Sequence, residues 1–122
     1  MVKSATSLTR SGLSDFIAQR VSAIVLALYT LCVLGFVLVT PELDRATWVE
    51  FHSRGTMKLF GVLAVVALAA HGWIGMWTIG TDYIREYSVG AKATTLRGLY
   101  MLLCAAAIFV YLAWGIDLFW SL

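Results

Sequence analysis

Residues 59–81 of this chain read LFGVLAVVALAAHGWIGMWTIGT, a run whose one ionisable side chain is His71. The run lies between Lys58 and Asp82. A helix needs about 20 apolar residues to cross a hydrocarbon core about 30 Å thick. Backbone amides in lipid must form their hydrogen bonds within the chain, so a helix is the structure that such a run supports. The segment therefore predicts a membrane-spanning helix with a histidine in its middle.

Two further uncharged runs, Val21–Val39 and Gly98–Ile116, have similar lengths. Of the 122 residues, 61% are hydrophobic and 13% are charged, whereas a soluble domain has about 45–50% apolar residues. We predict an all-α membrane protein with three transmembrane helices, which form a single transmembrane anchor domain over residues 1–122. The expected spans are approximately 16–39, 57–81 and 96–119.

The segments between the spans are too short to fold alone, so a soluble catalytic domain is excluded. The net charge of +2 is small and scattered, and it does not indicate nucleic-acid binding. We expect Ser14 or Asp15 to cap the first helix, because a side-chain oxygen there can accept an unpaired amide hydrogen. The loop around Trp48 is expected to form a short interfacial helix, with His52 exposed to solvent. Cys32 and Cys104 lie within apolar runs, where a free cysteine usually packs as a small hydrophobic residue.

The basic residues predict the orientation of the chain in the membrane. Lysine and arginine gather on the cytoplasmic side of membrane proteins. Six of them lie in the N-terminal segment and in the loop after the second span: Lys3, Arg10, Arg20, Arg85, Lys92 and Arg97. The opposite side has Arg45, Arg54 and Lys58, balanced by Glu42, Asp44 and Glu50. We therefore expect a cytoplasmic N-terminus and a C-terminus on the other side.

His71 is the first candidate site residue. An ionisable side chain inside a membrane is by default a functional-site hypothesis. No second histidine lies within a span, so a metal or haem at His71 would need a ligand from another protein. Ala67 and Gly75, one turn either side, leave room for a flat macrocycle, but small residues also favour close helix packing. Both interpretations remain open at this stage.

Asp82, Tyr83 and Arg20 are the other candidates. Asp82 follows His71 by eleven residues, about 16 Å along a helix and almost in phase with it. Asp82 and Tyr83 are open to two interpretations, an interfacial anchor with a solvated charge or part of a site. Arg20 could extend along the helix to the membrane surface, or it could bind an anionic group such as a haem propionate.

The segment from His71 to Tyr83, HGWIGMWTIGTDY, resembles the His-x-x-x-Gly-x(6)-Asp-Tyr signature of a known family, the small haem b membrane-anchor subunits (bacterial type) of succinate dehydrogenase, respiratory complex II. The segment from Ser11 to Ile24, SGLSDFIAQRVSAI, is similar to the start of that family's first helix. The resemblance extends over nearly the whole chain. It implies that the three helices pack with a partner anchor subunit into a larger bundle.

The resemblance also implies roles for the candidate residues. His71 matches an axial ligand of the haem b iron, with the second histidine coming from the partner anchor subunit. Arg20 matches a residue near the haem propionates. Tyr83 matches a tyrosine that donates a hydrogen bond to ubiquinone, and Asp82 matches a residue that borders the same quinone-binding pocket. No residue of this chain is expected to be catalytic for succinate.

Further partners follow from the resemblance: the flavoprotein subunit oxidises succinate, and the iron–sulfur subunit passes the electrons to quinone. The N-terminus lacks an Arg- and Ser-rich transit region, so we expect a multi-pass protein of the bacterial inner membrane. Three alternatives remain. The first is a haem-containing fumarate-reductase anchor. The second is a small transporter, although that class usually has four spans and an acidic residue in the first. The third is a cofactor-free assembly subunit.

Overall fold

The computed structural model describes residues 12–122, which form helices and no β-strand. The elements in chain order are α1 (Leu13–Leu38), α2 (Arg45–Ser53), α3 (Gly55–Tyr83), α4 (Glu86–Val89), the 3₁₀ turn η1 (Gly90–Lys92) and α5 (Ala93–Trp120). Helices α1, α3 and α5 are long and apolar enough to cross a membrane. They begin at residues 13, 55 and 93, two or three residues before the expected spans. The prediction of an all-α protein with three membrane-spanning helices is confirmed.

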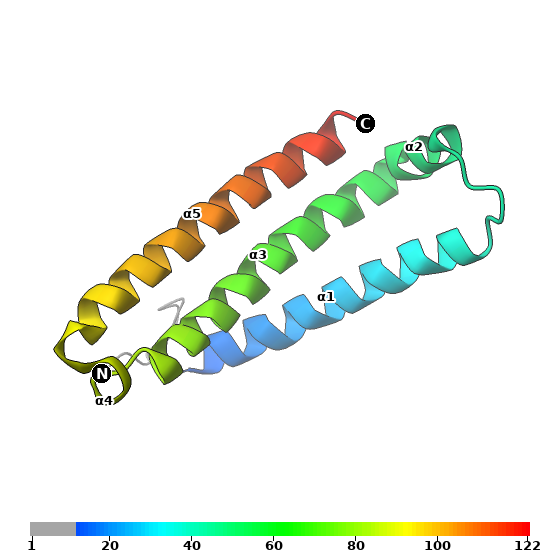
Figure 1. Ribbon diagram of the computed structural model, residues 1–122. Helices are drawn as coiled ribbons and strands as arrows, with labels where there is room; N and C mark the ends of the chain where they lie inside the picture. Colours follow the sequence, from blue (N-terminus) through cyan, green and yellow to red (C-terminus); the bar gives the residue numbers. More distant parts are fainter. Residues whose placement is uncertain (1–11) are drawn as a thin grey trace.

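The three long helices run antiparallel, with α3 between α1 and α5 (Figure 1). At one end of the bundle α1 begins, α3 ends and the short helix α4 leads into α5; we call this the Tyr83 end. At the other end, the α2 end, α2 connects α1 to α3 and α5 stops (Figure 1). Any site on α3 can therefore draw side chains from both neighbouring helices.

The start of α1 differs from the prediction. Its N-cap is Gly12, which makes no side-chain capping bond, and the Gly12 carbonyl accepts the Phe16 amide at 3.0 Å. Ser14 and Asp15 are therefore within the first turn rather than at the cap. A carboxylate there still faces the positive end of the helix dipole, which explains why Asp15 suits this turn.

The short helix expected around Trp48 is present as α2. Asp44 caps it, since its Oδ1 accepts the Thr47 amide at 2.8 Å. Hydrogen bonds from Thr47 hold the pKa of the Asp44 carboxyl below its ordinary value. The carboxylate form therefore favours the folded helix above the unfolded pKa of Asp44, and this contribution is lost as the pH falls through the lower folded value.

His52 is buried, and the prediction that it is exposed to solvent is wrong. Its side chain is 4% exposed and its Nδ1 lies 2.9 Å from the Trp48 carbonyl oxygen. The imidazole packs between aromatic rings, with centroids 4.1 Å from Trp48 and 5.1 Å from Phe51. Because α2 turns one face toward the bundle, a histidine on that face is covered although its segment is polar.

Close packing between α3 and α5 involves three glycines, and a Cβ atom on one of them, Gly80, would lie 2.9 Å from the Tyr100 ring. A Cβ atom on Gly115 would lie 2.9 Å from Cγ1 of Val65, which is too short for a normal contact. Gly61 lies so close to the Phe119 ring that a Cβ atom would overlap it. Small residues allow membrane helices to approach closely. Contacts between α1 and α3 rely on larger side chains, such as the edge-to-face pair of Tyr29 and Phe60 at 5.1 Å.

Most long apolar side chains of α1 and α5 face outward. Leu31 is 64% exposed and Phe109 is 70% exposed. The buried core consists of a few small or medium residues, among them Ala64, Ala67 and Ile74 of α3. An apolar exterior of this kind suits lipid or further helices.

We predict that Gly115→Ala destabilises the protein, because the added methyl group would overlap the stiff side chain of Val65. Overpacking of this kind typically costs about 1–3 kcal/mol. The matched control is Gly98→Ala on the same helix, where nothing lies within 4 Å of the added atom. The midpoint of thermal unfolding in detergent should fall for Gly115→Ala and stay level or rise for Gly98→Ala. Equal midpoints for the two variants would contradict the close approach of α3 and α5.

Candidate functional site

His71 lies on α3 and faces α1. Its Nδ1 is 3.2 Å from the hydroxyl oxygen of Ser22, and its side chain is half-buried. Ser22 is 5% exposed, and its hydroxyl is also 3.0 Å from the Gln19 carbonyl oxygen one turn earlier. Among residues 12–122, Nε2 of His71 has no hydrogen-bond partner. One ring nitrogen is thus bound within the bundle and the other is available.

The sequence does not identify Ser22 as a site residue. It stands among apolar residues of the first span, where an isolated serine carries no local signal. Its contact with His71 depends on the register of α1 against α3. Gly75 supports the same antiparallel register, because a Cβ atom there would be 3.9 Å from Nε2 of Gln19. Oε1 of Gln19 is buried and has no partner among residues 12–122.

The two small residues next to His71 have different environments. Ala67 is buried, 7% exposed, and serves close packing inside the bundle. Gly75 is partly exposed, and a Cβ atom built on it would be within ordinary contact distance of the Gln19 side chain. Close helix packing, one of the two interpretations left open above, therefore accounts for Ala67.

Arg20 is exposed near the start of α1. Its guanidinium carbon lies 4.8 Å from the centre of the Phe16 ring, a cation–π distance. It precedes Ser22 by two residues, about 3 Å along the helix axis. The charge is therefore close in depth to the His71–Ser22 contact and remains open to a partner group.

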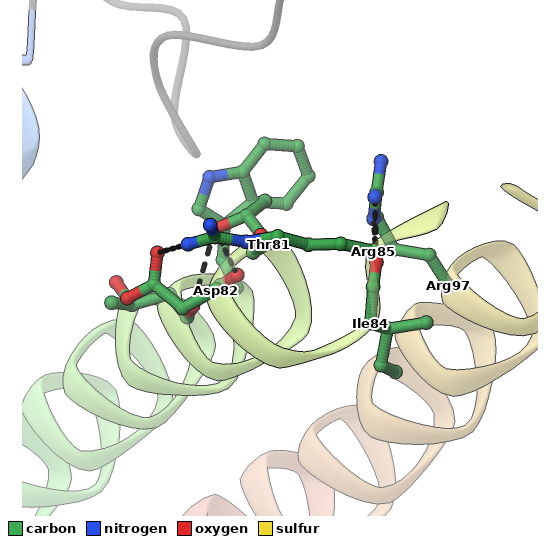
Figure 2. A network of polar contacts seen from close by, with 7 residues as sticks. Thr81, Asp82, Ile84, Arg85 and Arg97 are labelled. Atoms are coloured by element: carbon green, nitrogen blue, oxygen red, sulfur yellow. Dashed lines mark hydrogen bonds and ion pairs between the residues drawn. The ribbon is translucent and has the colours of Figure 1, made fainter. Parts of the chain in front are cut away.

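Asp82 and Tyr83 lie at the end of α3, away from His71. Asp82 forms an ion pair of 3.4 Å with Arg85, and the two side chains are 54% and 56% exposed. Arg85 also donates from Nε to the Thr81 carbonyl at 3.2 Å (Figure 2). The Tyr83 side chain is 72% exposed. Among residues 12–122, then, nothing covers the larger part of either side chain.

Arg97 of α5 bonds the end of α3 and so connects these two helices at the Tyr83 end of the bundle. Its Nε and a terminal nitrogen donate to the Ile84 carbonyl at 3.1 and 2.6 Å (Figure 2). Ile84 is the C-cap of α3, where backbone carbonyls lack helical partners. From the sequence, Arg97 is only one of the basic residues that predict orientation. In the structure it also bonds the backbone of Ile84, the residue that follows Tyr83 at the end of α3.

The described residues do not form a metal site of three or more ligands, because no group of three or more of their His, Cys, Asp or Glu side chains could hold a metal ion. Cys32 and Cys104 are free and half-buried. His71 can therefore supply one ligand to a metal, and the remaining ligands would have to come from elsewhere.

Comparison with known proteins gives the family. The model of the succinate dehydrogenase/fumarate reductase transmembrane subunit matches residues 3–116. The succinate dehydrogenase hydrophobic membrane anchor subunit of Coxiella burnetii (strain RSA 493 / Nine Mile phase I) is 31% identical over 112 residues, which cover 92% of this chain and 91% of the relative. The chain belongs to this family of transmembrane subunits.

Family membership confirms the resemblance drawn from the segment His71–Tyr83. The protein is a membrane-anchor subunit of an oxidoreductase complex, and it works with partner subunits of that complex. A small transporter is thereby excluded. The available ring nitrogen of His71 and the exposed Tyr83 are compatible with contacts to other subunits.

Proposed function

We propose that this protein supplies one axial ligand of a haem b and part of a ubiquinone-reduction site, and so passes electrons from succinate to quinone. The observation that carries the proposal is the imidazole of His71, held at Nδ1 by Ser22 while Nε2 is available inside a membrane-spanning helix bundle. Neutral imidazole is a common haem ligand. The whole chain, residues 1–122, acts as one anchor domain in this proposal.

The residues near His71 fit half of a haem site. The second axial histidine comes from the partner anchor subunit. Arg20, exposed and close in depth to Ser22, is the cation for a haem propionate, because guanidinium binds carboxylate through two hydrogen bonds. When bound, the haem supplies a one-electron carrier within the membrane. The role of this chain in the proposal is to supply one ligand to the iron, His71, and one cation for a propionate, Arg20.

Tyr83 and Asp82 are the contribution of this chain to the quinone site. The Tyr83 phenol donates a hydrogen bond to a quinone carbonyl, and this bond strengthens as negative charge develops on the oxygen. Asp82, paired with Arg85, borders the site. The partner anchor and the iron–sulfur subunit provide the other walls, which agrees with the 72% exposure of Tyr83 in this chain alone.

The complete reaction divides between the proteins of the complex. The flavoprotein subunit removes two electrons and two protons from succinate to form fumarate. The iron–sulfur subunit carries the electrons one at a time, and ubiquinone takes up two electrons and two protons to become ubiquinol. The family model also covers fumarate reductase, in which electrons flow from quinol to fumarate; a haem-containing anchor of that kind is the alternative.

The first prediction for this proposal concerns His71→Ala. Loss of one strong axial ligand should change the low-spin spectrum of the haem or lower the haem content of the purified complex. Reduced-minus-oxidised spectra normalised to flavin measure both. The control is His52→Asn, which removes the other imidazole of the chain and keeps a nitrogen donor near the Trp48 carbonyl. An unchanged bis-histidine spectrum in His71→Ala would refute the assignment.

The second prediction separates the quinone role from the haem role. Tyr83→Phe keeps the ring and removes the donor, so the haem content should stay normal. Quinone-linked succinate oxidation should fall about 10²-fold, the usual loss for one preorganised donor, while reduction of an artificial dye upstream continues. Tyr87→Phe, at a side chain that is 98% exposed, is the matched control. A wild-type ratio of quinone-linked to dye-linked activity would assign Tyr83 to interfacial anchoring alone.

The third prediction concerns orientation. The basic residues near the Tyr83 end favour the cytoplasmic side of a bacterial inner membrane for that end. A reporter that is active only in the cytoplasm should work when fused to the N-terminus and fail after Leu122. The reverse pattern would invert the proposed topology and move Tyr83 to the periplasmic side.

A further inference from the structure

The hydroxyl of Ser22 lies between two atoms that could take its single hydrogen. The Gln19 carbonyl oxygen is 3.0 Å from Oγ, and Nδ1 of His71 is 3.2 Å from it. A serine hydroxyl has one hydrogen to donate and two lone pairs to accept with. The direction of the bond between Ser22 and His71 therefore decides which ring nitrogen of His71 carries the proton.

In one arrangement Ser22 donates to the Gln19 carbonyl, as serines within helices commonly do toward the preceding turn. Oγ then accepts a hydrogen bond from Nδ1–H of His71. Every hydrogen in this small network has an acceptor. The lone pair of Nε2 is left unused, and an imidazole nitrogen with a free lone pair can bind a metal.

In the other arrangement Ser22 donates to Nδ1, and Nε2 carries the proton. Nε2–H would then have no acceptor among residues 12–122. An N–H group that loses water without gaining an acceptor is costly in an apolar interior. The first arrangement is therefore favoured. In agreement with it, Oγ of Ser22 lies closer to the Gln19 carbonyl oxygen, at 3.0 Å, than to Nδ1 of His71, at 3.2 Å.

We propose that Ser22 is a positioning residue that holds His71 in the Nδ1–H tautomer and so reserves Nε2 for the haem iron. This inference rests on the proposed haem ligation by His71. Histidines that bind metals usually donate their other ring N–H to a fixed acceptor, which orients the ring and raises the basicity of the ligand. Ser22 is buried in α1, so here the acceptor comes from the neighbouring helix.

The register of α1 against α3 keeps this acceptor in place. Gln19 lies next to Gly75, one turn beyond the contact between Ser22 and His71, and both pairs follow the same antiparallel register. Sliding α1 by one residue would break the contact between Ser22 and His71 and move Gln19 away from Gly75. Ser22 is thus held by helix packing as well as by its own bond to the Gln19 carbonyl.

A more basic axial ligand favours ferric over ferrous iron. Loss of the Ser22 acceptor should therefore weaken haem binding and raise the midpoint potential of the haem. Removal of such an outer acceptor typically costs about 10–100-fold in metal affinity. A serine hydroxyl is a neutral acceptor, so we expect a loss of haem affinity at the lower end of this range, about tenfold.

The test uses the intact complex with Ser22→Ala. The rate at which its haem transfers to an added apoglobin should rise about tenfold, and the midpoint potential should shift upward. Ser22→Thr keeps the hydroxyl and should restore both values. Ser53→Ala is the matched control, because the Ser53 hydroxyl makes the same bond to a carbonyl three residues earlier, 2.9 Å to Glu50, and Ser53 lies in α2 rather than against His71.

The potential distinguishes positioning from a merely structural role, which would lower thermal stability without moving the potential. Ser22→Ala with a wild-type potential and transfer rate would overturn the inference. If Ser22→Ala does not assemble, Ser22→Cys keeps a side chain of similar shape with a weak acceptor, and the same measurements apply. His71→Ala, measured in parallel, separates the two proposals. If His71→Ala leaves the haem unchanged, the proposed haem ligation by His71 is wrong. If His71→Ala changes the haem and Ser22→Ala does not, only the role of Ser22 is wrong.

Discussion

The absence of water in a lipid interior is the constraint on which this structure depends. Every backbone amide within the membrane needs a partner in its own chain, so the three apolar runs become the helices α1, α3 and α5. Association between them cannot come from apolar burial, since lipid is equally apolar, and instead depends on close packing. Gly115 against Val65 and Gly61 against Phe119 supply that packing between α3 and α5.

The central position of α3 explains the arrangement of the candidate residues. His71 in the middle of α3 meets Ser22 of α1, while Asp82 and Tyr83 stand at the end of the same helix. One helix thus sets the depth of both groups of candidate residues, about 16 Å apart along its axis. Arg97 bonds the C-cap of α3 and fixes where this helix ends. Within residues 12–122 neither group of candidate residues encloses a ligand by itself, which fits a protein that belongs to a larger complex.

The differences between prediction and structure have a common physical origin. The polar segment around His52 predicts exposure to solvent, yet α2 turns this side chain toward aromatic rings. Ser14 and Asp15 have the chemistry of a cap, but α1 begins at Leu13. Ala67 suits either a macrocycle or close packing, and its burial favours packing. For His52 and Ala67 the outcome depends on which face of a helix meets its neighbour, and for Ser14 and Asp15 on where the helix begins; residue type alone determines neither.

The sequence by itself determined the number and approximate limits of the membrane helices, and it singled out His71, Tyr83, Asp82 and Arg20 as candidates. These conclusions rest on hydropathy, length and spacing, which are local properties of the chain. Only the tertiary structure decided that Ser22 lies 3.2 Å from His71 and that Arg97 bonds Ile84. Such contacts join residues 49 and 13 positions apart. They depend on the register between helices, which side-chain packing sets and no local pattern encodes.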